Sequence, residues 1–212
     1  MKVPQIKICG LTRKEEAEFL NEVKADYAGF VFFEKSKRNV TFEQAQDIMY
    51  ALSADIKRVA VTVSPDAKLY QQIEDNGFDI LQVHGKLERE VLEQSNIPIW
   101  RAYNIENIKD LEQLEFHEKI TAYLMDAGTY GSGKTFDWQG SREITEKKEY
   151  YFKGKLFVLA GGLHSENVAE GIRIFEPDVV DVSSGVEKSL EDSGIGKDRQ
   201  LIMDFVNNAR AI

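Results

Sequence analysis

The chain has 212 residues, of which 42% are hydrophobic and 30% charged, a composition that suits a globular protein with a sizeable core. Its formal net charge of -9 and its sequence pI of about 5.0 argue against a general nucleic-acid binder. No apolar run approaches the length of about 20 residues that crosses a bilayer, so we expect no membrane association.

Cys9 is the single cysteine, which excludes an intramolecular disulfide and a zinc cluster built from several cysteines. The amino terminus shows no long apolar signal core and runs directly into a predicted strand. We therefore expect a cytoplasmic protein.

Apolar, β-rich runs recur along the chain, and helix-like stretches with apolar residues three or four positions apart follow most of them. The predicted strands cover residues 5–11, 27–33, 57–63, 80–84, 99–103, 122–127, 156–161 and 179–183. The predicted helical stretches cover 13–23, 42–52, 66–76, 86–93 and about 165–175. Capping boxes are expected at Thr12 with Glu15 and at Thr41 with Gln44.

Strands that alternate with helices predict a parallel sheet, and eight such units favour a closed barrel over an open sheet. The prediction is an α/β fold, a single-domain (β/α)8 TIM barrel over residues 1–212. The fifth and sixth units are the weakest, because the stretch after the fifth strand has few apolar residues and 130–140 resembles a long loop.

Alternation along the strands predicts which side chains face the barrel interior. The expected inward pairs are Lys7 with Cys9, Gln82 with His84, Leu124 with Asp126, and Asp181 with Ser183. The expected outward, helix-covered residues are Ile6, Ile8, Leu81, Val83, Met125, Ala127, Val180 and Val182. Lys7, Gln82 and Asp181 can either satisfy one another inside the barrel or take part in chemistry.

Cys9 and Asp126 are expected late in their strands, at the barrel mouth where catalytic residues of such barrels collect. A lone cysteine can also be a small buried hydrophobe. An acid and a thiol that face one cavity, however, suggest proton transfer.

Small residues follow the last two strands and predict a phosphate-binding site, because they let backbone N–H groups approach an anion. The residues concerned are Gly161, Gly162, Ser183 and Ser184. The loop 131–135, Gly-Ser-Gly-Lys-Thr, is similar to a P-loop but lacks its spacing and context.

Several blocks, in order along most of the chain, resemble phosphoribosylanthranilate isomerase. They are Lys7-Ile8-Cys9-Gly10-Leu11, Gly29-Phe30-Val31-Phe32 with Ser36-Lys37-Arg38, Gln82-Val83-His84-Gly85, Gly131-Ser132-Gly133-Lys134-Thr135-Phe136-Asp137-Trp138, Leu159-Ala160-Gly161-Gly162-Leu163 with Glu166-Asn167-Val168, and Asp181-Val182-Ser183-Ser184-Gly185-Val186-Glu187.

The resemblance implies a barrel that catalyses the Amadori rearrangement of N-(5-phosphoribosyl)anthranilate to 1-(2-carboxyphenylamino)-1-deoxyribulose 5-phosphate in tryptophan biosynthesis. It implies that Cys9 is the general base and Asp126 the general acid, and that Arg38 faces the anthranilate carboxylate. The loops with Gly161, Gly162, Ser183 and Ser184 would hold the phosphate. No cofactor or metal is implied, the partner is a small phosphosugar, and the protein is a monomer or a homodimer.

This chemistry requires a thiolate at Cys9, so we expect Lys7 to help lower the pKa of the thiol, and it requires a raised pKa at Asp126. Two features depart from the family pattern: Tyr130 before Gly131, and the segment 189–197. We expect them to alter the dynamics of these loops more readily than the reaction.

The alternative functions are a phosphosugar-binding barrel without this activity, a Schiff-base lyase that uses Lys7, and a metal-dependent epimerase. The metal ligand set is poor, because of the three histidines only His84 faces inward, where we expect it to pack or hydrogen-bond.

Overall fold

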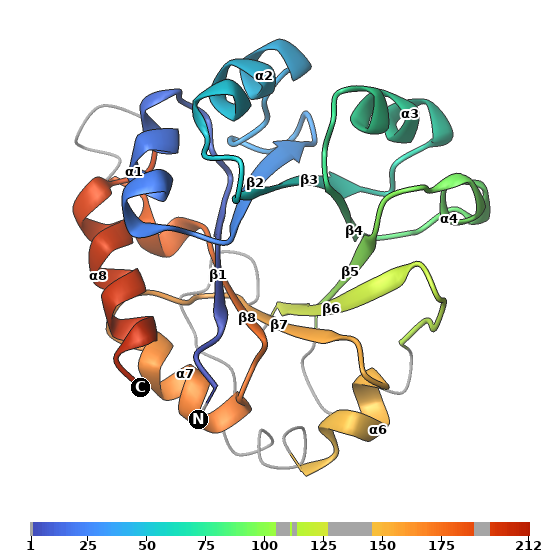
Figure 1. The fold of residues 1–212 in the computed structure, drawn as a ribbon. Coiled ribbons are helices and arrows are strands. Elements are labelled where there is room, and N and C mark those ends of the chain that lie inside the picture. The colour runs from blue at the N-terminus through green and yellow to red at the C-terminus, as the bar shows by residue number, and fades with distance from the viewer. Residues whose placement is uncertain (1, 105–110, 112–113, 127–145, 189–195) are drawn as a thin grey trace.

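The computed structural model describes residues 2–104, 111, 114–126, 146–188 and 196–212. Eight parallel strands close into a barrel in chain order, with β8 paired to β1, which confirms the predicted TIM barrel (Figure 1). The strands are β1 (Gln5–Cys9), β2 (Tyr27–Phe32), β3 (Lys57–Val63), β4 (Ile80–His84), β5 (Ile99–Asn104), β6 (Ile120–Asp126), β7 (Leu156–Ala160) and β8 (Val179–Val182).

Helices surround the barrel on its outside (Figure 1). They are α1 (Glu15–Val23), α2 (Phe42–Ala51), α3 (Ala67–Asp75), α4 (Arg89–Gln94), α6 (Lys148–Phe152), α7 (Val168–Phe175) and α8 (Arg199–Arg210), with the short 3-10 helix η2 (Ser184–Val186) after β8. Within the described residues, none of these helices has the length and apolar character needed to cross a membrane.

The two predicted capping boxes have different outcomes. At α2 the box is confirmed, because Thr41 Oγ1 accepts from the Gln44 N–H at 3.1 Å and Gln44 Oε1 accepts from the Thr41 N–H at 2.9 Å. At α1 the prediction is wrong, because the helix begins at Glu15 itself, and the carboxylate of Glu16 accepts from the Thr12 N–H at 2.7 Å instead.

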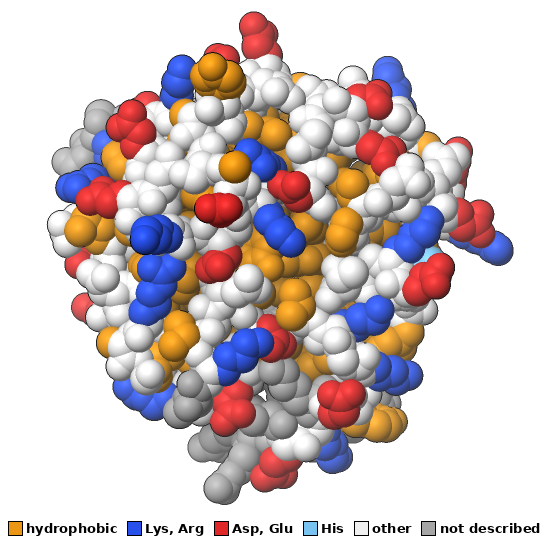
Figure 2. Space-filling view, viewed as in Figure 1, with side chains coloured by type: hydrophobic (Ala, Val, Ile, Leu, Met, Phe, Trp, Pro, Cys, Tyr) orange, Lys and Arg blue, Asp and Glu red, His pale blue; other side chains and the backbone are white. Residues whose placement is uncertain are grey.

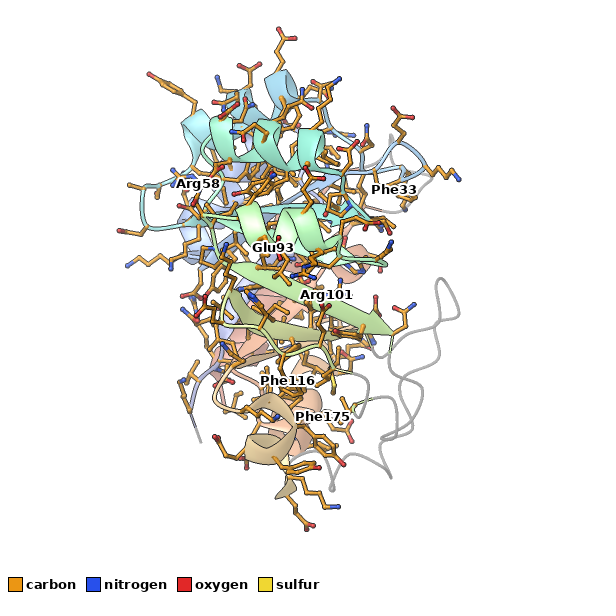
Figure 3. The ribbon with its side chains drawn as sticks, turned by 90° about the vertical axis from the view of Figure 1, so that its right-hand side faces the viewer. Phe33, Arg58, Glu93, Arg101, Phe116 and Phe175 are labelled. Carbon is orange, nitrogen blue, oxygen red and sulfur yellow. The ribbon has the colours of Figure 1, made fainter. Side chains whose placement is uncertain are left out.

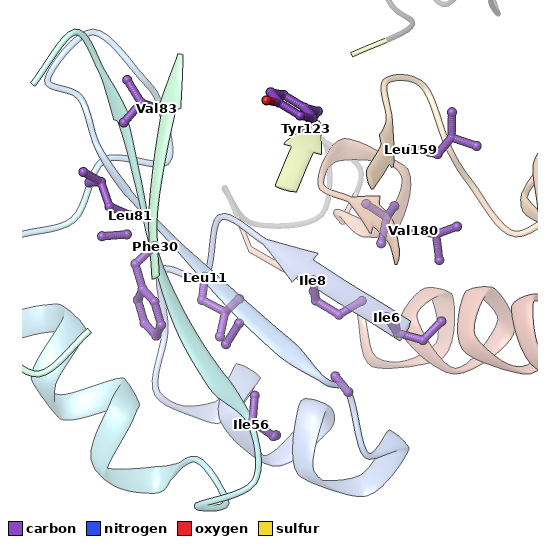
Figure 4. Close-up of a cluster of buried hydrophobic side chains, with 14 of the residues drawn as sticks. Ile6, Ile8, Leu11, Phe30, Ile56, Leu81, Val83, Tyr123, Leu159 and Val180 are labelled. Carbon is purple, nitrogen blue, oxygen red and sulfur yellow. The ribbon is translucent and has the colours of Figure 1, made fainter. Parts of the chain in front are cut away.

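The barrel has two apolar layers, as alternation predicts. Outward side chains of the strands pack under the helices (Figure 4), and these include Ile6, Ile8, Leu81, Val83, Met125, Val180 and Val182. Inward side chains form a second cluster, which includes Cys9, Tyr27, Val59, Val61, Trp100, Leu124 and Val158. The predicted faces are confirmed for the residues in these two clusters. Ala127 lies outside the described residues.

Of the strands that end earlier than predicted, β1 and β8 matter most for the site. β1 stops at Cys9 because Gly10 has a φ of +81°, which leaves the extended conformation. β8 stops at Val182, because Ser183 has φ -127° and ψ -80°. Cys9 and Ser183 therefore stand where strand turns into loop.

The two ends of the barrel differ. Phe33, just after β2, and Arg58, near the start of β3, lie at opposite ends (Figure 3), so the carboxyl ends of the strands gather on the Phe33 side. The chain termini lie at the other end, which faces the viewer in Figures 1 and 2 and shows hydrophobic side chains near its centre with charges of both signs around them.

Candidate active site

Cys9 is the last residue of β1, and its side chain belongs to the interior cluster. It is only 8% exposed. Its register partner on β2 is Gly29, where an added Cβ would lie 2.8 Å from the Cys9 Sγ. The absence of a side chain at Gly29 therefore leaves the space that the thiol occupies.

A buried ion pair lies next to this thiol. The Lys7 Nζ donates to the Asp181 Oδ2 at 2.8 Å, and the two side chains are 0% and 8% exposed. Burial lowers the pKa of Lys7, but the charge of Asp181 and the hydrogen bonds with Asp181 and Cys9 outweigh it and the pKa is raised. Lys7 is thus a protonated ammonium, which opposes the lyase alternative, because a Schiff base forms from a neutral amine.

The expected lowered pKa of Cys9 is wrong. Burial raises the pKa of the thiol, and Asp181 adds to this, while the positive charges of Lys7 and Lys197 oppose it without outweighing it. The physical reason is that a thiolate loses its hydration inside the barrel. The sequence indicated that Lys7 lies beside Cys9, but it did not indicate how deeply the thiol is buried.

Asp126 ends β6 and is half-buried. Alternation places it on the same face as Leu124, which is in the interior cluster, whereas Met125 between them packs outward. Its register partner on β7 is Ala160, another interior residue. Cys9 and Asp126 therefore both project inward at the carboxyl end of the barrel. The raised pKa expected for Asp126 stays a prediction.

The two predicted phosphate loops touch each other. Gly161 and Gly162 have φ values of +87° and +64°, which favour glycine. In the next loop, a Cβ on Gly185 would lie 2.0 Å from the Leu163 carbonyl oxygen. The backbones of the β7 and β8 loops thus approach closely because Gly185 has no side chain.

The β8 loop also contacts the strand of the thiol. The Ser183 hydroxyl donates to the Cys9 carbonyl at 3.0 Å. Ser184 is exposed and begins η2. The structure thus brings the predicted site residues Ser183 and Cys9 into direct contact and places Ser184 beside them on the same loop.

Arg38 lies in the loop between β2 and α2, where its guanidinium binds a carboxylate of this chain. Its Nε donates to the Glu187 Oε1 in a short contact, and its Nη2 donates to the Glu187 Oε2 at 3.0 Å. Lys197 Nζ lies 3.1 Å from the same Glu187 Oε1. Sequence reasoning missed Glu187 and Lys197, although Glu187 closes the last motif block, four residues after Ser183.

Glu187 is strongly acidic in this environment. Burial alone raises the pKa of its carboxyl, but the hydrogen bond from Arg38 and the charges of Lys197 and Arg38 lower it to about 2. Lys197 is fully buried at its side chain. Burial lowers the pKa of Lys197, against the opposing charges of Glu187 and Cys9.

His84 makes a hydrogen bond, as expected. Its Nε2 lies 2.9 Å from the Gln82 Nε2, and burial together with the charges of Lys7 and Arg101 lowers its pKa to about 4. The imidazole is therefore neutral and accepts from the amide. No group of three or more potential metal ligands is found among the described residues.

Two sequence features lie outside the described residues. They are the loop 131–135 with its neighbour Tyr130, and the part of the variable segment that covers 189–195.

The sequence matches the family described as PRAI, N-(5'phosphoribosyl)anthranilate (PRA) isomerase, over residues 6–208. The N-(5'-phosphoribosyl)anthranilate isomerase of Thermoanaerobacter sp. (strain X514) is 39% identical, and the match covers 98% of each chain.

The fold is also similar to solved structures of phosphoribosyl anthranilate isomerases. The crystal structure of phosphoribosyl anthranilate isomerase from Thermotoga maritima is 33% identical, with a TM-score of 0.84 over 99% of this chain and 100% of that one. A complex of such an isomerase with reduced 1-(o-carboxyphenylamino)-1-deoxyribulose 5-phosphate is 32% identical, with a TM-score of 0.81 and the same coverage. A third structure, of monomers generated from the dimeric Thermotoga maritima protein, is 34% identical, with a TM-score of 0.79 over 99% of this chain and 100% of that one.

Proposed function

The chain belongs to the N-(5'-phosphoribosyl)anthranilate isomerase family and is an isomerase of tryptophan biosynthesis, and we propose that Cys9 and Asp126 are the acid–base pair of its reaction. The reaction converts N-(5-phosphoribosyl)anthranilate to 1-(2-carboxyphenylamino)-1-deoxyribulose 5-phosphate. The observation that carries the proposal is the position of both side chains, each the last residue of its strand and each on the interior face.

The proposed chemistry consists of proton transfers. Asp126 in its protonated form donates to the ribose ring oxygen, and the ring opens to an iminium ion at C1. The Cys9 thiolate then removes the proton from C2, which gives an enolamine. Protonation at C1 and loss of the proton from the C2 hydroxyl give the ketose. These steps balance without a cofactor.

The raised pKa of Cys9 in the ligand-free protein bears on when the thiolate forms. Ring opening creates a positive charge on the iminium group, close to the carbon whose proton Cys9 removes. A nearby positive charge favours the thiolate, as do Lys7 and Lys197. We therefore place the deprotonation of Cys9 in the substrate complex rather than in the free protein.

The substrate has two anionic ends, and two sets of residues suit them. Arg38 offers the planar fork of donors that fits the anthranilate carboxylate. Gly161, Gly162, Ser183 and Ser184 lie on loops that bring small residues together at the same end of the barrel, where they would hold the phosphate. The contact between Ser183 and Cys9 would place the phosphate loop beside the base.

The remaining partners follow from the same account. The ligand is a small phosphosugar, and the net charge of -9 gives no support for nucleic-acid binding. A cytoplasmic location fits a biosynthetic isomerase with one cysteine. Of the two assembly states, monomer and homodimer, the relative described as dimeric supports the second.

The test follows the fluorescence of freshly made phosphoribosylanthranilate. The wild-type protein should consume it and form the ketose. Binding without consumption would support the phosphosugar-binding alternative, and covalent trapping of a phosphosugar on Lys7 by borohydride would support the lyase.

A further inference from the structure

One edge of the Arg38 guanidinium is already occupied. Glu187 accepts from the Nε–H and from one Nη2–H, in a side-on geometry. A guanidinium has five N–H donors, so two on Nη1 and one on Nη2 are not used by Glu187. The remaining Nη2–H and one Nη1–H form the end-on edge of the fork, which can still bind a second carboxylate with two parallel hydrogen bonds.

Glu187 is itself held from the backbone and from a buried cation. It forms an isolated antiparallel bridge with Lys197, flanked by the bonds Lys188 N–H to Gly196 O at 3.0 Å and Asp198 N–H to Val186 O at 2.9 Å. The Lys197 ammonium, 0% exposed, donates to the Glu187 Oε1 and to the Ser183 carbonyl, both at 3.1 Å. The carboxylate that binds Arg38 therefore has a fixed position.

Lys197 is fixed in turn to the loop of the thiol. Its backbone N–H donates to Glu16 Oε1 at 2.6 Å, while the other oxygen of Glu16 accepts from the Thr12 N–H at 2.7 Å. Glu16 is 1% exposed. One buried carboxylate thus ties the loop after Cys9 to the residue that holds Glu187.

The side chain of Arg38 passes close to Gly10. A Cβ added to Gly10, the neighbour of Cys9, would lie 2.5 Å from the Arg38 Cδ and 3.3 Å from the Ser183 Oγ. Lys37 adds a third cation 3.2 Å from Glu187. Three basic side chains thus contact the Glu187 carboxylate, which suits an anionic ligand.

We propose that Glu187 is a specificity-determining positioning residue: it fixes one edge of the Arg38 guanidinium so that the other edge meets the carboxylate of the substrate's aromatic ring. The inference rests on the proposed function, because it takes Arg38 as the residue that binds this carboxylate. Glu187 acts through Arg38 and selects for carboxylate-bearing ligands.

The test compares two ligands by calorimetry. One is reduced 1-(o-carboxyphenylamino)-1-deoxyribulose 5-phosphate, and the other is its analogue with an unsubstituted phenyl ring. Glu187→Gln should weaken binding of the first ligand about tenfold, because Arg38 would no longer be held in position for its charge-assisted hydrogen bonds to the carboxylate. Binding of the second ligand should weaken by less than about twofold. The KM for substrate should rise by a similar factor, with kcat nearly unchanged. Glu34→Gln removes an exposed carboxylate from the same loop as Arg38 and should change neither ligand's affinity.

A double-mutant cycle makes the inference specific. In an Arg38→Met background, Glu187→Gln should no longer affect the carboxylate ligand. Equal weakening of both ligands would overturn the inference, as would tighter binding of the carboxylate ligand, which would mean that Glu187 competes with it for Arg38.

Two controls keep the test decisive. Retained binding of the phenyl analogue shows that the variant is folded. If Glu187→Gln does not fold, Glu187→Asp keeps the charge for Lys197 on a shorter stem and carries the same prediction. A wild-type protein that neither consumes the substrate nor binds either ligand would instead contradict the proposed function.

Discussion

Lys7 donates to Asp181 at 2.8 Å inside the barrel, two residues before Cys9 along β1. Neither charge can regain water if its partner is removed. Lys7→Met should therefore lower the free energy of unfolding by about 3–5 kcal/mol, measured by urea denaturation. The double variant with Asp181→Leu should recover most of this loss, because it leaves no unpaired charge. Equal stability of Lys7→Met and the wild type would contradict the role of the pair.

The pH dependence of Cys9 alkylation tests the state of the thiol in the free protein. Because burial raises its pKa, Cys9 is protonated at pH 7, and iodoacetamide should react with it more slowly than with free cysteine. The rate should increase with pH through an apparent pKa above the free value of about 8.5. A midpoint below that value would show that the neighbouring lysines outweigh burial.

The contribution of the Glu187 carboxylate to folding stability should be lost in acid. Its pKa is about 2 in the folded protein and lies below its ordinary value of 4.5, so its contribution is present above 4.5 and disappears as the pH falls towards 2. Glu187→Gln should be less stable at pH 7 by about 3 kcal/mol, because it leaves Lys197 unpaired. Thermal unfolding from pH 7 to pH 2 should show the difference from wild type shrink. A constant difference across this range would contradict the assignment.

A substitution at Gly29 tests whether the missing side chain there leaves room for the Cys9 thiol. An alanine there would place its Cβ 2.8 Å from the Cys9 Sγ and 3.0 Å from the Cys9 Cα, so the thiol must move. We expect Gly29→Ala to reduce kcat at least tenfold, since a small misplacement of a reacting group is costly. Gly77→Ala is the control, because Gly77 has a φ of +75° with no atom near its missing Cβ. It should cost about 1 kcal/mol of stability and leave kcat unchanged. Equal kcat values in the two variants would contradict the role of Gly29 in positioning the Cys9 thiol.

The strand pattern of the sequence predicted the barrel and its inner face well, because a period of two residues is a local property of the chain. Ile6 and Ile8 pack outward and Lys7 and Cys9 inward for this reason. The capping box at Thr12 was wrong because the first residue of a helix depends on the backbone conformation of the preceding loop.

Other features could not be read from spacing. The bridge pairs Glu187 with Lys197, the last residue of the segment 189–197 that departs from the family pattern. No local sequence pattern at either residue predicts this pairing. The direction of the Cys9 pKa depends on the balance between burial and two lysines, and Lys197 comes from a distant part of the chain. Such balances require the folded arrangement.

The central claim is that Cys9 and Asp126 carry out the proton transfers. The most direct test measures kcat of Cys9→Ser and Asp126→Asn in the phosphoribosylanthranilate fluorescence assay, with binding of the reduced product analogue as the check on folding. Each variant should bind the analogue nearly as the wild type does and lose at least about a thousandfold in kcat. Turnover at the wild-type rate in both variants would contradict the account.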